Sequence, residues 1–194
     1  MEHPDQSYQL EVKNLTKVYE GGVQALTDVS FKVKKGEFLA IIGLSGSGKS
    51  TLLRCINRLI DPTEGSIVFS GMAVTGATDD ELRHIRRKIG MVFQHFNLVS
   101  RSSVLTNVLA GRLGYANPAW SLLNRFSKDD INTAIKQLDR VGIADKASYR
   151  ADELSGGQQQ RVGVARALMQ DPEMILADEP VASLDPVLAH SIMQ

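Results

Sequence analysis

Two short glycine-rich segments constrain the fold of this chain more than any other feature of its sequence. The first is Gly-Leu-Ser-Gly-Ser-Gly-Lys-Ser at residues 43–50, and the second is Leu-Ser-Gly-Gly-Gln at residues 154–158. At average residue usage, the pattern Gly-x-x-x-x-Gly-Lys-Ser/Thr arises by accident in well under about one in a hundred chains of this length, and the five-residue one in about one in several thousand. Their joint presence is therefore not a chance event.

Length and composition restrict the classes of protein. A chain of 194 residues that is 43% hydrophobic can bury a sizeable core and is most simply one domain. Its 22 basic and 22 acidic residues balance, which excludes a global basic field for nucleic acid or an anionic membrane, though not a local patch. The single cysteine, Cys55, rules out an internal disulfide and fits a reducing compartment; we expect it to be a small core residue on a helix.

We expect neither a signal peptide in residues 1–9 nor a membrane span in this sequence. Residues 1–9 carry Glu2, Pro4 and Asp5 and lack an apolar stretch. The longest apolar run, at 38–42, is far too short to cross a bilayer.

The pattern of apolar residues predicts an α/β layout with an all-helical stretch in the middle. Alternation predicts half-buried strands at 10–12 and 29–33, and a turn at 34–37 leads into a fully apolar strand at 38–42. A helix is expected from Lys49 to about Leu59. Further short strands are expected at 67–69, 91–93 and 174–177.

Helical spacing is expected from Val104 to about Arg150. Within this stretch we expect one helix that begins at the N-cap Ser127, with Asp130 three residues on, and ends at Gly142. Its apolar face is expected to comprise Ile131, Ile135 and Leu138.

The first glycine-rich segment has the context of a phosphate-binding loop. It follows an apolar run and opens a helix, so its backbone N–H groups can cradle phosphates at the positive helix end. Lys49 would then reach the β- and γ-phosphates, and the Ser50 hydroxyl would bind Mg²⁺. A glycine-rich turn that holds nothing would not call for a lysine and a serine at this spacing.

An apolar strand at 174–177 runs into two acids, Asp178 and Glu179. A buried parallel strand delivers such carboxylates to the carboxyl edge of the sheet, beside the phosphate loop. There Asp178 can take Mg²⁺ through water, and Glu179 can polarise the attacking water. Without other motifs, this acid pair would be interpreted as a solvated strand end. The presence of the phosphate loop favours the interpretation as a Mg²⁺-binding and catalytic pair.

The two glycine-rich segments, in this order, resemble those of the ATP-binding subunit of an ABC transporter. In that family the Leu-Ser-Gly-Gly-Gln segment of one subunit closes over the γ-phosphate bound on the opposite subunit. The resemblance thus implies a site shared by two ATPase subunits. Two glycines that let backbone approach a phosphate, a serine donor and a helix N-terminus suit that task.

Three more elements match the same family. Gln94 resembles the Q-loop glutamine that senses Mg²⁺ and the attacking water, in a loop that faces the membrane subunit; alone it would be a polar strand end. Residues 183–186, Ser-Leu-Asp-Pro, resemble the D-loop that crosses the dimer interface. Tyr19 resembles the aromatic residue that stacks on adenine, with core packing as its alternative.

The resemblance implies roles for individual residues. Those assigned to ATP are Tyr19, Gly43, Leu44, Ser45, Gly46, Ser47, Gly48, Lys49, Ser50, Thr51, Ser155, Gly156, Gly157, Gln158 and Asp185. Those assigned to Mg²⁺ are Ser50, Gln94 and Asp178, and those assigned to catalysis are Glu179 and Gln94.

Other segments are similar to the phosphonate-importing subfamily. They are residues 111–115, 120–123, 125–126, 150–153 and 180–183. In that subfamily none of them contacts the solute, so the substrate rests on kinship. The resemblance implies a second ATPase subunit, integral membrane permease subunits and, indirectly, a periplasmic solute-binding protein as partners. It implies no nucleic acid, and a peripheral location on the cytoplasmic face of the inner membrane.

The expected fold is an α/β P-loop NTPase core of the ABC ATPase type. Residues 1–194 would form a single domain, with a helical subdomain at about 95–160. The resemblance implies a switch histidine after a further strand beyond the D-loop, and this sequence stops at Gln194 before it. His3, His84, His95 and His190 are not substitutes for it. We therefore expect the C-terminal strands of the family to be missing.

Two other functions stay open from the sequence. One is a truncated ABC module that binds ATP but hydrolyses it poorly, for which the ending at Gln194 is the evidence. The other is a soluble ABC ATPase of DNA repair or translation. The repair type needs a long coiled coil between the two segments, and the roughly one hundred residues here leave no room. The translation type usually has two cassettes.

An apolar group in the helical insert is a candidate permease contact. It consists of Trp120, Leu122, Leu123 and Phe126, near Pro118. Packing inside the insert is the alternative reading.

Overall fold

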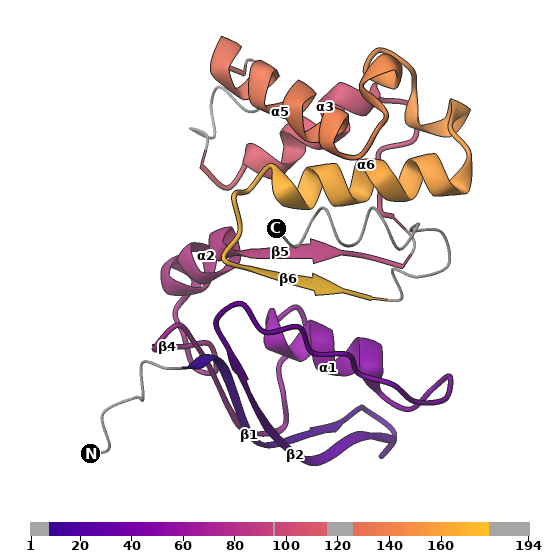
Figure 1. Ribbon diagram of the computed structural model, residues 1–194. Helices are drawn as coiled ribbons and strands as arrows, with labels where there is room; N and C mark the ends of the chain where they lie inside the picture. Colours follow the sequence, from indigo (N-terminus) through magenta and orange to yellow (C-terminus); the bar gives the residue numbers. More distant parts are fainter. Residues whose placement is uncertain (1–7, 95, 116–125, 179–194) are drawn as a thin grey trace. The chain divides into compact units, whose positions relative to one another are not determined.

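The computed structural model describes residues 8–94, 96–115 and 126–178 (Figure 1). The chain divides into two compact units, 1–86 and 87–194. Within the described residues, no helix is both long and apolar enough to span a membrane.

The first unit is built on a four-stranded antiparallel sheet in the order β2-β1-β3-β4 (Figure 1). Its strands are β1 (Tyr8–Val18), β2 (Gln24–Lys34), β3 (Glu64–Phe69) and β4 (Met72–Ala73). The central strand β1 places Leu10 between Val33 of β2 and Phe69 of β3, and all three side chains are buried. The strands expected at 10–12, 29–33 and 67–69 are therefore confirmed, within longer elements.

Two helices belong to this part of the chain. α1 (Lys49–Ile56) buries Leu52 and Cys55, which confirms the expected position of the cysteine. It ends three residues earlier than expected, because Arg58 turns into the left-handed region at φ 47°. α2 (Asp79–Lys88), which extends two residues past the boundary between the units, was not expected: its sequence is strongly charged and buries only Leu82 and Ile85.

The strand expected at 38–42 is wrong. These residues form no regular element, and Phe38 and Ile42 are 75% and 93% exposed. A strand exists only where a neighbour completes its backbone hydrogen bonds, and neither sheet of the described residues includes this segment. Its apolar composition predicted the tendency to be buried but not the partner.

The second unit combines a short parallel sheet with helices (Figure 1). β5 (Ile89–Val92) and β6 (Met174–Ala177) pair in register from Ile89↔Met174 to Val92↔Ala177. The helical elements are α3 (Val104–Leu109), η1 (Ala110–Arg112), α5 (Lys128–Arg140), η2 (Ala144–Lys146), η3 (Ala151–Glu153) and α6 (Gly156–Leu168). The strand expected at 174–177 is confirmed, and so is the helical character of the described residues between 104 and 150.

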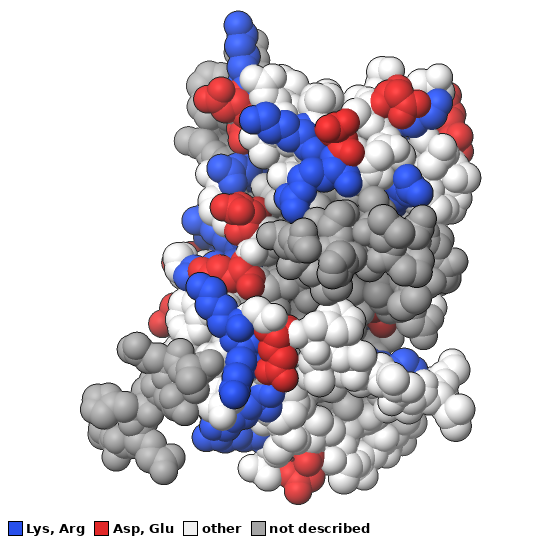
Figure 2. All heavy atoms as spheres, viewed as in Figure 1, with Lys and Arg blue, Asp and Glu red and all other residues white. Residues whose placement is uncertain are grey.

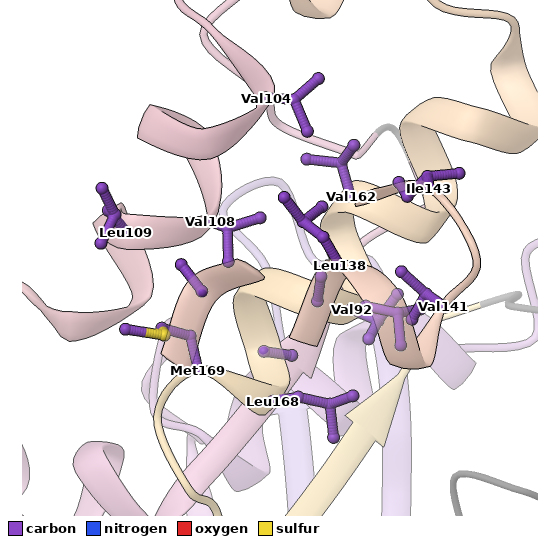
Figure 3. Close-up of a cluster of buried hydrophobic side chains, with 14 of the residues drawn as sticks. Val92, Val104, Val108, Leu109, Leu138, Val141, Ile143, Val162, Leu168 and Met169 are labelled. Atoms are coloured by element: carbon purple, nitrogen blue, oxygen red, sulfur yellow. The ribbon is translucent and has the colours of Figure 1, made fainter. Parts of the chain in front are cut away.

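One hydrophobic cluster holds the helices of this unit together. Figure 3 shows Val108 of α3, Leu138 of α5 and Val162 of α6 in this cluster, and all three are fully buried. Burying such side chains stabilises a fold by about 1.5–3 kcal/mol each relative to exposure. The cluster fixes α6, and with it the second glycine-rich segment, against α3 and α5.

The ends of α5 are as expected, but its buried face differs. Ser127 caps the helix by accepting a hydrogen bond from the Asp130 N–H at 3.0 Å, and Gly142 follows its end at φ +69°. The buried residues are Ala134 and Leu138, whereas Ile131 and Ile135 are each 37% exposed. The buried stripe runs through 134, 138 and 141, so Ile131 and Ile135 lie at its edge.

Candidate nucleotide site

The phosphate loop ends at Gly48, which is the N-cap of α1. Gly46 and Gly48 adopt φ +79° and +91°, a region that only glycine enters without strain. A Cβ on Gly48 would lie 2.3 Å from the Ala25 carbonyl oxygen, so β2 approaches the loop too closely for any side chain. Gly48 provides no side-chain cap, so no capping side chain lies between the N-terminus of α1 and an approaching anion.

The Lys49 ammonium folds back over this loop. Its Nζ donates to the carbonyl oxygens of Gly43 and Leu44, both at 2.8 Å. The loop itself is closed by a hydrogen bond from the Ser47 N–H to the Leu44 carbonyl at 3.2 Å. The partners of this ammonium are neutral carbonyl oxygens, and its stem is flexible. It can therefore exchange them for charged phosphate oxygens, which bind an ammonium more strongly.

Tyr19 lies just beyond the end of β1 and contacts the start of α1. Its hydroxyl is 3.2 Å from Thr51 Oγ1, and the Lys17 ammonium lies 5.3 Å from the ring centroid. The side chain is 37% exposed, which argues against the core-packing alternative. Its stacking on adenine stays a prediction.

Asp178 and Gln94 lie at the carboxyl edge of the parallel sheet in the second unit. Asp178 directly follows β6, is 3% exposed, and donates its N–H to the Val92 carbonyl at 3.0 Å. Gln94 lies two residues beyond the end of β5 and is exposed. Because carboxyl ends of parallel strands share an edge, Asp178 and Gln94 both lie beyond strand ends at the same edge of this sheet.

Gln94 and Asp178 supply an amide oxygen and a carboxylate, the hard oxygen ligands that Mg²⁺ prefers. The hydroxyl of Ser50 has the same chemistry, and its place in a common Mg²⁺ site stays a prediction. Ser50 belongs to the first unit, and Gln94 and Asp178 to the second. Glu179 and Asp185 lie outside the described residues, so their expected roles stay predictions.

The second glycine-rich segment forms the N-terminus of α6. Ser155 Oγ accepts from the Gln158 N–H at 3.4 Å, and the Gln158 side-chain oxygen accepts from the Ser155 N–H at 2.9 Å. This capping box holds the first turn while Gly156 faces open space. Beside it lies a cavity of about 360 Å³, lined in part by Ser155, Gln158, Arg161 and the ion pair between Lys146 and Asp145, whose atoms are 3.4 Å apart.

Arg166 is a functional candidate that the motifs did not predict. Its guanidinium donates to the carbonyl oxygens of Asn97 at 2.7 Å and Phe96 at 2.6 Å, in the loop that carries Gln94. Desolvation lowers the pKa of Arg166 from its usual value, although an arginine stays charged at neutral pH. The sequence held one indication of this role. Arg166 stands between Ala165 and Ala167, two small apolar residues typical of a buried helix face.

The candidate permease contact is described only at Phe126. This side chain is half-buried against the hydrophobic cluster of the helices, which supports packing inside the insert for that residue. Trp120, Leu122 and Leu123 lie outside the described residues.

Comparisons with known proteins agree with this geometry. The model of the family described as ABC transporter matches residues 26–182. The chain is 53% identical over 184 residues to the phosphonates import ATP-binding protein PhnC 3 of Halalkalibacterium halodurans, covering 95% of this chain and 71% of that protein. It is 55% identical over 185 residues to PhnC of Lactobacillus johnsonii, covering 95% and 72%.

Solved structures match as well. The dimeric structure of MJ0796, a bacterial ABC transporter cassette, superposes with a TM-score of 0.83 at 40% identity, covering 95% of this chain and 80% of that one. A post-hydrolysis state of MJ0796 bound to ADP and Pi gives a TM-score of 0.82, with the same identity and coverage.

Proposed function

Because this chain belongs to the ABC transporter family, we propose that it is the ATP-hydrolysing subunit of an importer for phosphonate or a related oxyanion. The chain is an ATPase of this family, and two relatives that are 53% and 55% identical are named as phosphonate import proteins. The observation that carries the proposal is the phosphate loop, in which Lys49 lies over the mouth and Gly48 opens α1.

The residues of this chain divide the work on ATP. Backbone N–H groups of 43–50 and the N-terminus of α1 bind the phosphates, and Lys49 exchanges its two carbonyl partners for β- and γ-phosphate oxygens. Ser50, Gln94 and Asp178 would hold Mg²⁺, which when bound neutralises charge that develops on the phosphates. Glu179 accepts a proton from the attacking water, and Gln94 orients that water.

A second copy completes the site. Ser155, Gly156, Gly157 and Gln158 of one subunit close over the γ-phosphate on the other, and Asp185 lies at the contact between the copies. Closure on MgATP and reopening after hydrolysis move membrane permease subunits, to which a periplasmic protein delivers the solute. The chain works as a peripheral subunit on the cytoplasmic face of the membrane.

Replacing Lys49 tests the nucleotide part of this proposal. Lys49→Ala removes the ammonium from the loop, so MgATP affinity measured by calorimetry should fall at least about tenfold, the usual effect of losing a charge-assisted contact to phosphate. Lys136→Ala, which removes an exposed lysine of α5, is the matched control. Unchanged affinity and turnover in Lys49→Ala would refute the assignment.

The solute is tested separately by growth. In a bacterium that lacks its own phosphonate ATPase, this chain with its permease and binding protein should permit growth on methylphosphonate as the sole phosphorus source. Lys49→Ala should abolish that growth. Active ATP turnover without growth would exclude methylphosphonate as the solute while leaving the ATPase assignment intact.

A further inference from the structure

The loop that follows β5 adopts a conformation that its residues do not favour. Phe96 and Asn97 are consecutive non-glycine residues in the left-handed region, at φ 52° and 47°. Each such residue costs free energy, and a pair persists only where the surroundings hold it. An element outside the loop must therefore supply compensating contacts.

Arg166 supplies them from α6. Its two terminal nitrogens bind the carbonyl oxygens of Phe96 and Asn97, the same two residues that are strained. The planar guanidinium fits two adjacent carbonyls as a fork, which fixes the direction of both peptide groups. Because the group is charged and desolvated, these bonds are stronger than those between neutral partners.

The helix that carries Arg166 is itself rigidly placed. A Cβ on Gly111 would lie 2.3 Å from the Arg166 carbonyl oxygen, so η1 and α6 touch backbone to backbone at this residue. A second contact to the loop comes from Asn107 of α3, which is buried. Its side-chain amide accepts a hydrogen bond from the Val99 N–H and donates one to the Val99 carbonyl oxygen. The loop from Gln94 to Val99 is thus held by α6 at one point and by α3 at another.

We propose that Arg166 is a positioning residue, which ties the loop of Gln94 to the helix that begins at the Ser155–Gln158 segment. A displacement of α6, when its N-terminus meets a nucleotide, is passed through the guanidinium to Phe96 and Asn97 and so to Gln94. This inference rests on the proposed roles of Gln94 and of the α6 N-terminus in ATP hydrolysis.

Hydrogen exchange on the whole, nucleotide-free chain tests the tie without using catalysis. Arg166→Met keeps the apolar stem and removes the fork, so backbone amides at 96–99 should exchange at least about tenfold faster while those of β5 and α6 keep their rates. Arg140→Met is the matched control, because Arg140 binds only Gln137 on its own helix among the contacts described. Equal exchange at 96–99 in Arg166→Met and the parent chain would overturn the proposal.

Further variants separate positioning from general stability. If Arg166→Met unfolds, Arg166→Lys is measured in its place. A single ammonium then replaces the guanidinium fork, so amide exchange at 96–99 should become severalfold faster. Unchanged exchange rates in Arg166→Lys would overturn the proposal. Adding Asn97→Gly to either variant should recover part of the protection, because glycine adopts positive φ without strain. If Asn97→Gly restores no protection from exchange in any folded variant, backbone strain at Asn97 is not what Arg166 offsets, and the proposal fails.

A functional measurement links the tie to Gln94. In Arg166→Met the MgATP affinity should stay within about twofold, while the Mg²⁺ concentration for half-maximal turnover rises by about tenfold. A loss of affinity in Lys49→Ala, together with unchanged Mg²⁺ dependence in Arg166→Met, would overturn the tie and leave the ATPase proposal standing. Unchanged affinity in Lys49→Ala would overturn the ATPase proposal, with the exchange data on the loop unaffected.

Discussion

At the scale of single residues, two glycines of the phosphate loop look alike in sequence and differ in their surroundings. Both have positive φ, but a Cβ on Gly46 would meet nothing within 4 Å, whereas one on Gly48 would lie 2.3 Å from the Ala25 carbonyl oxygen. Gly46→Ala should therefore cost about 1 kcal/mol in free energy of unfolding, from backbone strain alone. Gly48→Ala adds a backbone clash and should cost about 2–4 kcal/mol.

Urea denaturation of the two variants and the parent chain measures this difference. Equal destabilisation by both substitutions would contradict the close approach of β2 to Gly48. Gly36→Ala is a useful reference, since that glycine also has positive φ and open space around it, and it lies in a turn outside the phosphate loop.

Cys55 gives a prediction on pH at the same scale. Burial raises the pKa of its thiol, so the folded chain resists ionisation that the unfolded chain undergoes near pH 8.5. The contribution of Cys55 to the free energy of unfolding should then be constant below that pH and decline as pH rises above it. Cys55→Ala should remove part of the decline, measured by urea denaturation between pH 7 and 10. A parallel decline in both proteins would contradict a raised pKa.

Residues also show what the sequence can and cannot reveal. The spacing of Lys49 and Ser50 predicted their place at the opening of α1, because the loop and the helix are contiguous in sequence. The role of Arg166 could not be predicted, since its partners lie about 70 residues away and a charged helix residue normally faces solvent.

At the scale of elements, α5 and α6 begin with the same kind of cap. Ser127 caps α5 and Ser155 caps α6, each accepting a hydrogen bond from the N–H three residues on. Replacing either serine by alanine should cost about 1 kcal/mol in free energy of unfolding. Only Ser155→Ala should also weaken dimer formation in MgATP, because only α6 carries the proposed γ-phosphate contact.

Ser127→Ala is thus the control for Ser155→Ala. Light scattering in MgATP reports the dimer, and thermal unfolding reports the cap. If both variants lower dimer formation equally, the effect follows from stability, and the contact assigned to Ser155 would be wrong.

The success of sequence-based prediction differed between elements for a physical reason. The strand at 174–177 was located correctly because a short apolar run ending in two acids is typical of a buried parallel strand. The run at 38–42 has the same composition, yet it is unpaired among the described residues, because pairing depends on a neighbour elsewhere in the chain. α2 has few apolar residues, so hydrophobic periodicity did not reveal it.

At the scale of the whole molecule, the 22 basic and 22 acidic residues balance in number. On the face in Figure 2, Lys and Arg are interspersed with Asp and Glu. Ion pairs such as Lys32–Glu11 at 3.0 Å and Lys88–Glu173 at 2.9 Å neutralise charge within a unit. Without a field of one sign to drive association, dimer formation should depend on the bound nucleotide rather than on long-range attraction.

Glu179 provides the test of that dependence. Glu179→Gln keeps the shape of the side chain but removes the carboxylate that takes a proton from water, so turnover should fall by about 10²- to 10⁴-fold while MgATP still binds. A dimer that closes on ATP and opens after hydrolysis should then accumulate, and light scattering in MgATP should show a mass twice that of the monomer.

Glu173→Gln is the matched control, since it removes the same charge just before the opposite end of β6, where Glu173 pairs with Lys88. This variant should hydrolyse ATP at the parent rate and return to monomer. A Glu179→Gln chain that binds MgATP yet stays monomeric would show that ATP does not hold two copies together. The α6 N-terminus would then need another ligand to explain the open space at Gly156 and the cavity beside it.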